Sequence, residues 1–147
     1  KDIQQTNFRY EHQKLGINIM YTANWLNEKI AGILSQEDIT QQQYNILRIL
    51  RGADKPLSTL QIRARMLDKM SDTSRIVDRL VAKELVEKNT CPTDKRLVDV
   101  VLSKKGFVIL EKLDQLNHHL DALMKGISEK DAITMNQLLD QLREVSK

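Results

Sequence analysis

The spacing of apolar residues along the chain predicts a protein made mostly of helices. From Leu15 onward, apolar residues recur every three or four positions, which is the period of one face of an α-helix. We therefore expect a long first helix over about residues 8–34. A second helix is predicted to begin at Thr40, because Gln43 stands three residues later in the spacing of a capping box. It should end near Gly52, since glycine readily adopts the left-handed conformation that closes many helices.

Two short helices separated by a tight turn are predicted to follow. Ser58 and Gln61 repeat the capping-box spacing and open a helix that runs to about Met66. After a break at residues 68–71, a second helix is expected over residues 72–84, with an apolar face opposite a polar one. The apolar face consists of Ile76, Val77, Leu80 and Val81, and the polar face of Thr73, Arg75, Asp78 and Arg79. Two short helices joined in this way form a helix-turn-helix.

The pattern then changes to that of a β-hairpin. Residues 85–90 fit the two-residue period of a strand, and residues 91–96 have the composition of a turn. The β-branched residues of 97–102 predict the returning strand. A helix-turn-helix followed by a hairpin is the plan of a winged helix, whose second helix enters the major groove of DNA.

Two leucine-striped helices are predicted to complete the chain. Ser103 can cap a long helix that ends at Gly126, and Ser128 can cap the last helix. The apolar stripe of the last helix is Met135, Leu138, Leu142 and Val145. A lone subunit would expose this stripe to water, so we expect an obligate homodimer.

These elements place the chain in a mostly α fold class with a small β-hairpin. Its 147 residues suit one domain. We expect a winged helix-turn-helix lobe over residues 40–103, flanked by dimerisation helices within residues 1–34 and 104–147.

The distribution of charge changes the picture more than the net charge of +3 does. Residues 48–106 contain fourteen Lys and Arg but eight Asp and Glu, whereas the rest of the chain contains nine and twelve. A basic centre is expected of a protein that binds a polyanion, although a lysine-rich solvated surface has the same composition.

Two blocks of sequence resemble one known family. The run from Ser74 to Glu87 resembles the recognition helix, and the strand after it, of the MarR family of winged-helix transcription regulators. Asp94-Lys95-Arg96, followed by residues 102–106, is similar to the wing of that family and the start of its next helix. One departure is Glu84, where the family usually places glycine.

This resemblance implies a bacterial DNA-binding regulator that acts as a homodimer on a pseudo-palindromic operator. Repression by blocking a promoter is the expected outcome. The resemblance also implies that a small aromatic or lipophilic effector releases the DNA. A winged-helix module that binds another protein and no DNA remains the alternative, because fold does not fix function.

Candidate DNA contacts fall in three places. Helix N-termini carry free backbone N–H groups and partial positive charge, so the expected helix starts can hold phosphates. The residues at these starts are Ser58, Thr59, Gln61 and Ser71. The start of the second short helix offers Thr73, Ser74 and Arg75 to base edges, and arginine can bond both acceptors of guanine.

Arg79 lies one turn further along, and there the sequence leaves open a phosphate contact or an ion pair with Asp78 or Glu84. In the wing, the resemblance implies that Arg96 enters the minor groove while Asp94 orients it or pins the hairpin, with Lys95 between them. The alternative for this segment is a solvated turn. Arginine suits a narrow minor groove because of its negative potential.

An effector site is expected near three aromatic residues. Tyr21 and Trp25 share one face of the first helix, and Tyr44 lies on the second. The resemblance implies effector binding near these helices, but ordinary core packing explains the same three residues equally well.

Several classes of function are not expected. The sequence has no phosphate-binding loop, nucleophile elbow or metal-ligand spacing, so we predict neither an enzyme nor a bound metal or cofactor. No apolar run approaches the roughly 20 residues that span a bilayer, so no membrane association is expected. The single cysteine, Cys91, suits a reducing compartment, and we expect a cytoplasmic protein.

Overall fold

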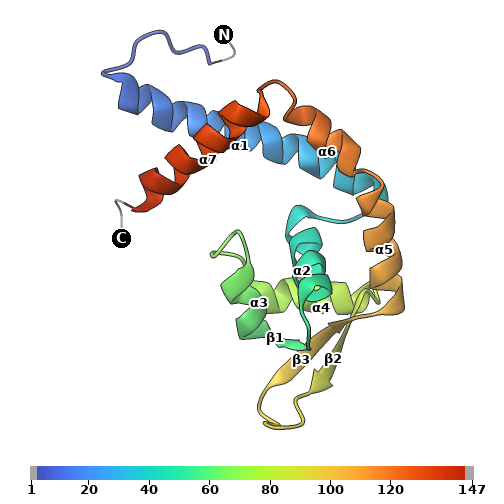
Figure 1. Cartoon of the computed structure of the whole chain (residues 1–147). Coiled ribbons are helices and arrows are strands. Elements are labelled where there is room, and N and C mark those ends of the chain that lie inside the picture. Colours follow the sequence, from blue (N-terminus) through green and yellow to red (C-terminus); the bar gives the residue numbers. More distant parts are fainter. Residues whose placement is uncertain (1–2, 145–147) are drawn as a thin grey trace. The chain divides into compact units, whose positions relative to one another are not determined.

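The computed structural model describes residues 3–144, which form helices with one small sheet (Figure 1). The chain divides into two compact parts, one ending at Gln115 and the other beginning at Leu116. No helix of the described residues is long and apolar enough to cross a membrane.

The first part begins with α1 (Glu11–Leu34) and a 3₁₀ turn (Ser35–Glu37). Only Leu34 of α1 is buried, and most of the apolar face of this helix is exposed or half-buried. The left-handed residue Asp38, with a φ of 54°, turns the chain toward the next helix. This geometry suits an aspartate, whose short polar side chain tolerates the left-handed region better than most.

The second helix, α2 (Gln41–Gly52), begins as the sequence predicts. Thr40 Oγ1 accepts a hydrogen bond from the N–H of Gln43, and Gln43 Oε1 accepts one from the N–H of Thr40. The helix also ends at Gly52, but none of the described glycines has a positive φ, so the predicted left-handed closure is wrong. The chain leaves α2 through an extended Ala53 instead.

The winged-helix plan inferred from the sequence is present in the elements that follow. They are β1 (Leu57–Ser58), α3 (Thr59–Arg65), α4 (Thr73–Ala82), β2 (Val86–Thr90) and β3 (Val98–Leu102). The strands form an antiparallel sheet in the order β1-β3-β2, with Leu57 opposite Val100 and Val86 opposite Leu102. The sequence predicted the β2–β3 hairpin but not β1, which is two residues long. Figure 1 shows this hairpin extending away from α2, α3 and α4.

One apolar core holds α2, α3, α4 and the sheet together. Its fully buried members include Ile46, Leu47, Ile62, Val77, Leu80 and Val100. Leu110 of α5 (Lys104–Asp114) is also fully buried, so the first turns of α5 pack on this lobe. At the end of α5, the carboxylate of Asp114 binds the guanidinium of Arg51 on α2. The hydrogen bond to Asp114 raises the pKa of Arg51.

The described residues of the second part form two helices, where the sequence predicted the end of one long helix and a separate last helix. The predicted helix from Ser103 to Gly126 is interrupted, since α5 ends at Asp114 and α6 (Asn117–Leu123) begins after a two-residue break. The last helix, α7 (Glu129–Glu144), starts as predicted, because Ser128 Oγ accepts a hydrogen bond from the N–H of Asp131.

The apolar stripe of α7 is exposed as predicted for the residues that the structure describes. Met135, Leu138 and Leu142 are each about half exposed. Val145, the fourth residue of the predicted stripe, lies outside the described residues. A role for this stripe in dimerisation therefore stays a prediction.

Candidate nucleic-acid interface

The start of α3 is closed by the capping box that the sequence predicts. Ser58 Oγ accepts a hydrogen bond from the N–H of Gln61 (3.2 Å), and Gln61 Oε1 accepts one from the N–H of Ser58 (2.9 Å). Thr59, between them, is half-buried, and Gln61 is exposed. The hydroxyl of Ser58 and the side-chain NH₂ group of Gln61 can still donate hydrogen bonds to a phosphate oxygen.

The start of α4 differs from the prediction at Ser71. The residue that caps this helix is Asp72, whose Oδ1 accepts a hydrogen bond from the N–H of Arg75 (3.3 Å). Ser71 is buried, and its Oγ accepts a hydrogen bond from Nε2 of Gln42 on α2 (3.3 Å). The prediction that Ser71 caps α4 at an exposed phosphate site is therefore wrong.

Thr73 also lies on the buried side of α4. It is 3% exposed, and its Oγ1 has no hydrogen-bond partner among the described residues. Val81, which the sequence placed on the apolar face, is 36% exposed. The polar face of the helix is thus rotated from its predicted position, and it presents Ser74, Arg75, Asp78 and Arg79 to solvent.

The arginines of α4 are left without acidic partners. Asp78 forms an ion pair with Lys88 on β2, and Glu84 forms one with Lys105 on α5 (3.7 Å). Arg79 therefore forms an ion pair with neither Asp78 nor Glu84, the two partners that the sequence had left open. Within residues 3–144, neither Arg75 nor Arg79 forms an ion pair, so both guanidinium groups are free to meet a polyanion.

In the wing, Asp94 and Arg96 are hydrogen-bonded to each other, which is one of the two roles that the resemblance left open for Asp94. Asp94 accepts hydrogen bonds from Nε of Arg96 (3.1 Å), from its Nη2 (3.2 Å) and from its backbone N–H (3.0 Å). These bonds lower the pKa of Asp94, and the bond with the side chain of Arg96 has the largest effect. The side chain of Arg96 is nevertheless 90% exposed, and the neighbouring Lys95 is exposed as well. Asp94 therefore orients a guanidinium group that still faces outward.

Three further cations near this surface were not singled out from the sequence. Arg63 and Arg65 occupy the last turn of α3, and Lys69 lies in the turn before α4. All three residues are exposed. The excess of basic residues over 48–106 was the one signal for them, but composition does not say which cations lie beside the recognition helix.

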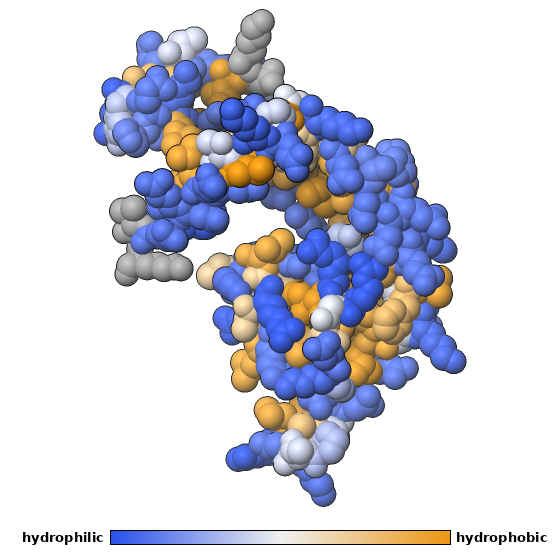
Figure 2. Space-filling model, in the orientation of Figure 1, coloured by the Kyte–Doolittle hydropathy of each residue, from blue (hydrophilic) through white to orange (hydrophobic). Residues whose placement is uncertain are grey.

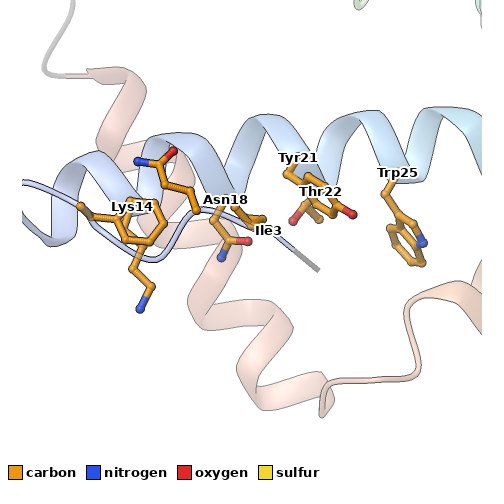
Figure 3. Close-up of a pocket in the computed structure, with 8 residues that line it drawn as sticks. Ile3, Lys14, Asn18, Tyr21, Thr22 and Trp25 are labelled. Atoms are coloured by element: carbon orange, nitrogen blue, oxygen red, sulfur yellow. The ribbon is translucent and has the colours of Figure 1, made fainter. Parts of the chain in front are cut away.

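Two of the three predicted effector residues line a cavity of about 520 Å³. Figure 3 shows Tyr21 and Trp25 of α1 pointing to the same side, together with Thr22. The other lining residues are Ile3, Gln5, Phe8, Lys14 and Asn18. The segment before α1 thus supplies one wall, which no pattern in the sequence predicted.

Tyr44, the third predicted effector residue, lies elsewhere. It is buried in the core of the lobe, with the guanidinium of Arg48 5.4 Å from its ring centre. It is not part of the cavity lining. For Tyr44, core packing was the correct alternative.

Sequence comparison relates the chain to one family. Residues 37–97 match the model of the MarR family. The multiple antibiotic resistance protein MarR of Escherichia coli is 31% identical over 112 residues, which cover 74% of this chain and 76% of that protein.

Structure comparison agrees. A crystal structure of an Escherichia coli MarR mutant complexed with operator DNA has a TM-score of 0.83 at 27% identity, covering 93% of this chain and 99% of the other. The Staphylococcus aureus MepR–DNA complex has a TM-score of 0.80 at 19% identity, covering 95% and 99%, and shows similarity of fold.

Proposed function

This chain belongs to the MarR family of transcription regulators, and on that premise we propose that it binds double-stranded DNA at an operator and represses transcription. The observation that carries the proposal is the solvent face of α4. Arg75 and Arg79 lie on this face without ion pairs among the described residues, while Asp78 of the same helix is paired with Lys88. A helix surface of this kind suits the negative potential of a DNA groove.

The three parts of the interface serve different contacts. Arg75, near the start of α4, is proposed to bond guanine in the major groove, and Arg79 to bond a phosphate. Ser58, Thr59 and Gln61 at the start of α3 are proposed to hold the DNA backbone, with Ser74 close enough to the helix start to approach a base edge.

Arg96 is proposed to enter the minor groove beside the major groove that α4 occupies. Asp94 holds its guanidinium through two hydrogen bonds, which reduces the number of conformations that binding would have to restrict. The exposed Lys95 adds a second cation at the wing tip.

A homodimer is proposed as the functional unit. Leu138 and Leu142 expose an apolar stripe on α7, and Leu15 and Met20 are exposed on α1. Large apolar surfaces of this kind mark association sites. Two copies related by a two-fold axis would read half-sites about 10 bp apart in an operator, and would block a promoter that overlaps it. Such a regulator would work in the cytoplasm.

The cavity on α1 is proposed to hold a small aromatic or lipophilic effector. Tyr21, Trp25 and Phe8 offer ring faces, and Asn18 and Thr22 offer hydrogen-bonding groups. Trp25 is the only tryptophan of the chain, so its fluorescence reports on this cavity directly. A ligand that quenches Trp25 and also weakens DNA binding would support the proposal, and Tyr21→Ala should weaken that quenching while Tyr44→Phe should not.

DNA binding is tested by fluorescence anisotropy with duplex from upstream of the protein's own gene. The affinity should fall steeply between about 50 and 200 mM salt, because cations that bind phosphates displace counterions. Arg79→Ala should reduce the slope of log affinity against log salt by roughly one for each phosphate that the arginine neutralises. Absence of binding at low salt would favour the alternative, a module that binds protein and no DNA.

A further inference from the structure

The turn between α3 and α4 presents two large apolar side chains to water. Leu67 is 79% exposed and Met70 is 92% exposed. We call residues 67–70, with these two side chains, the apolar turn. Figure 2 shows hydrophobic residues at the surface of the lobe in the region where Figure 1 places the turn between α3 and α4. Among the described residues, Met70 is one of the most exposed apolar side chains. Packing in the core therefore does not explain an apolar residue at this position.

The apolar turn is held in place by hydrogen bonds on both sides of Met70. Asp68 Oδ1 accepts a hydrogen bond from the N–H of Met70 (3.0 Å), and the carbonyl of Asp68 accepts one from the N–H of Ser71 (3.3 Å). The ammonium group of Lys69 donates to the carbonyl of Ala64 on α3. The exposure of Met70 is thus a feature of a formed turn, which directs the side chain away from the lobe.

The position of the apolar turn is continuous with the proposed DNA surface. Met70 lies two residues before Asp72, the cap of α4, and so at the same end of the helix as Ser74 and Arg75. Arg63, Arg65 and Lys69 flank it with positive charge. The carboxylate of Asp68 is directed into the turn itself, and that of Asp72 into the start of α4.

An apolar side chain among cations has a specific counterpart in DNA. The walls of the major groove are phosphates, which match the cations, and the prominent apolar group on its floor is the C5 methyl of thymine. We propose that Met70, with Leu67 beside it, packs against thymine methyl groups at the edge of each half-site, and that the apolar turn thereby adds a preference for thymine next to the bases that α4 reads. This inference rests on the proposed function and specifies further base contacts within it.

The test compares two duplexes that differ only in these methyl groups. The promoter duplex is prepared with thymidine and again with deoxyuridine in its place, and the affinity of the full chain for both is measured by fluorescence anisotropy at one salt concentration. The unmodified chain should prefer the thymidine duplex by about fourfold for each methyl group that the turn covers. Met70→Ser should lose most of this preference, and Met70→Leu should keep it.

Met124→Ser is the matched control. Met124 is 52% exposed at the end of α6, in the other compact part of the chain, so its substitution removes a similar side chain that does not belong to the proposed surface. Its thymidine preference should equal that of the unmodified chain. Because Met70 is exposed, Met70→Ser should fold normally, and a circular dichroism melt verifies this.

Two results would overturn the inference while leaving DNA binding intact. The first is an unmodified chain with no thymidine preference. The second is a Met70→Ser variant that retains the preference, whether its affinity is unchanged or falls equally for both duplexes. A shift of Met70→Ser from dimer to monomer in sedimentation would also overturn it, because the turn would then contact a second copy of the chain. An unmodified chain that bound neither duplex would overturn the proposed function and this inference with it.

Discussion

The hydroxyl of Ser103 donates a hydrogen bond to the carbonyl oxygen of Glu84 across 2.6 Å. The same Oγ accepts a hydrogen bond from the N–H of Gly106 (3.0 Å), so it also caps α5. Glu84 has a φ of 62° and closes α4 in a Schellman motif, in which its N–H binds the carbonyl of Val81 and the N–H of Leu85 binds that of Leu80. One serine thus joins the end of the recognition helix to the start of the helix that leaves the lobe.

Glu84→Gly should raise the free energy of unfolding by roughly 0.5–1 kcal/mol. The left-handed conformation costs a non-glycine residue about 1–2 kcal/mol, and the greater freedom of glycine in the unfolded chain offsets part of the gain. Urea unfolding at one fixed protein concentration measures the change. Glu84→Ala is the control and should have little effect, because it keeps the strain and removes only an exposed ion pair with Lys105. Equal effects of the two variants would contradict the explanation.

Gly106→Ala should destabilise the protein by about 1–3 kcal/mol. A methyl group at this position would overlap the carbonyl oxygen of Leu85 and lie 3.0 Å from the side chain of Leu102. Gly16→Ala is the matched control, since a methyl group there meets no atom within 4 Å, and it should stabilise α1 by roughly 0.5–1 kcal/mol. Thermal melts of both variants check the difference in sign.

The carboxyl group of Asp94 should titrate below the usual range for aspartate in an NMR pH titration. Its hydrogen bonds with the side chain and the N–H of Arg96 favour the charged form, which lowers its pKa. The contribution of this pair to the order of the wing is therefore present above the unfolded pKa and is lost as the pH falls through the folded pKa. Arg96→Ala should raise the pKa of Asp94 only partway, because the backbone N–H remains. Lys95→Ala should leave it unchanged, and a shift as large as that of Arg96→Ala would contradict the assignment.

Arg75→Ala and Arg96→Ala should change DNA recognition in different ways. Loss of Arg75 should cost about 1–3 kcal/mol of binding free energy and relax the preference at one base pair in each half-site. Loss of Arg96 should weaken binding chiefly where an A·T-rich flank narrows the minor groove. Binding to a library of operator variants reports both patterns. If Arg96→Ala weakened binding equally on A·T-rich and G·C-rich flanks, the wing would contact only phosphates.

Leu138→Glu should convert the proposed dimer to monomers. Leu138 is 58% exposed on α7, and a glutamate would place a charge within the apolar stripe. Sedimentation velocity measures the change, with Gln137→Glu as a control on the exposed polar side of the same helix. A stable, folded monomer for the unmodified chain would contradict the dimer itself.

The sequence determined the features that depend on neighbours along the chain. The capping boxes at Thr40 and Ser58 form between residues three apart, and the ion pair of Asp94 with Arg96 forms between residues two apart. Such contacts need only a local backbone conformation. Residue type and spacing were sufficient to predict the capping boxes, whereas the pair of Asp94 with Arg96 was expected from the family resemblance. The apolar period of α4 likewise predicted that Ile76, Val77 and Leu80 are buried.

The tertiary structure decided the features in which distant residues compete for the same group. Ser71 and Asp72 are both suitable helix caps, but Asp72 caps α4, and the hydroxyl of Ser71 accepts a hydrogen bond from Gln42, 29 residues away. Tyr44 packs into the core rather than the cavity, and the segment before α1 supplies the cavity wall in its place. These outcomes depend on which surfaces meet after the chain folds, and a pattern that repeats every three or four residues does not specify such partners.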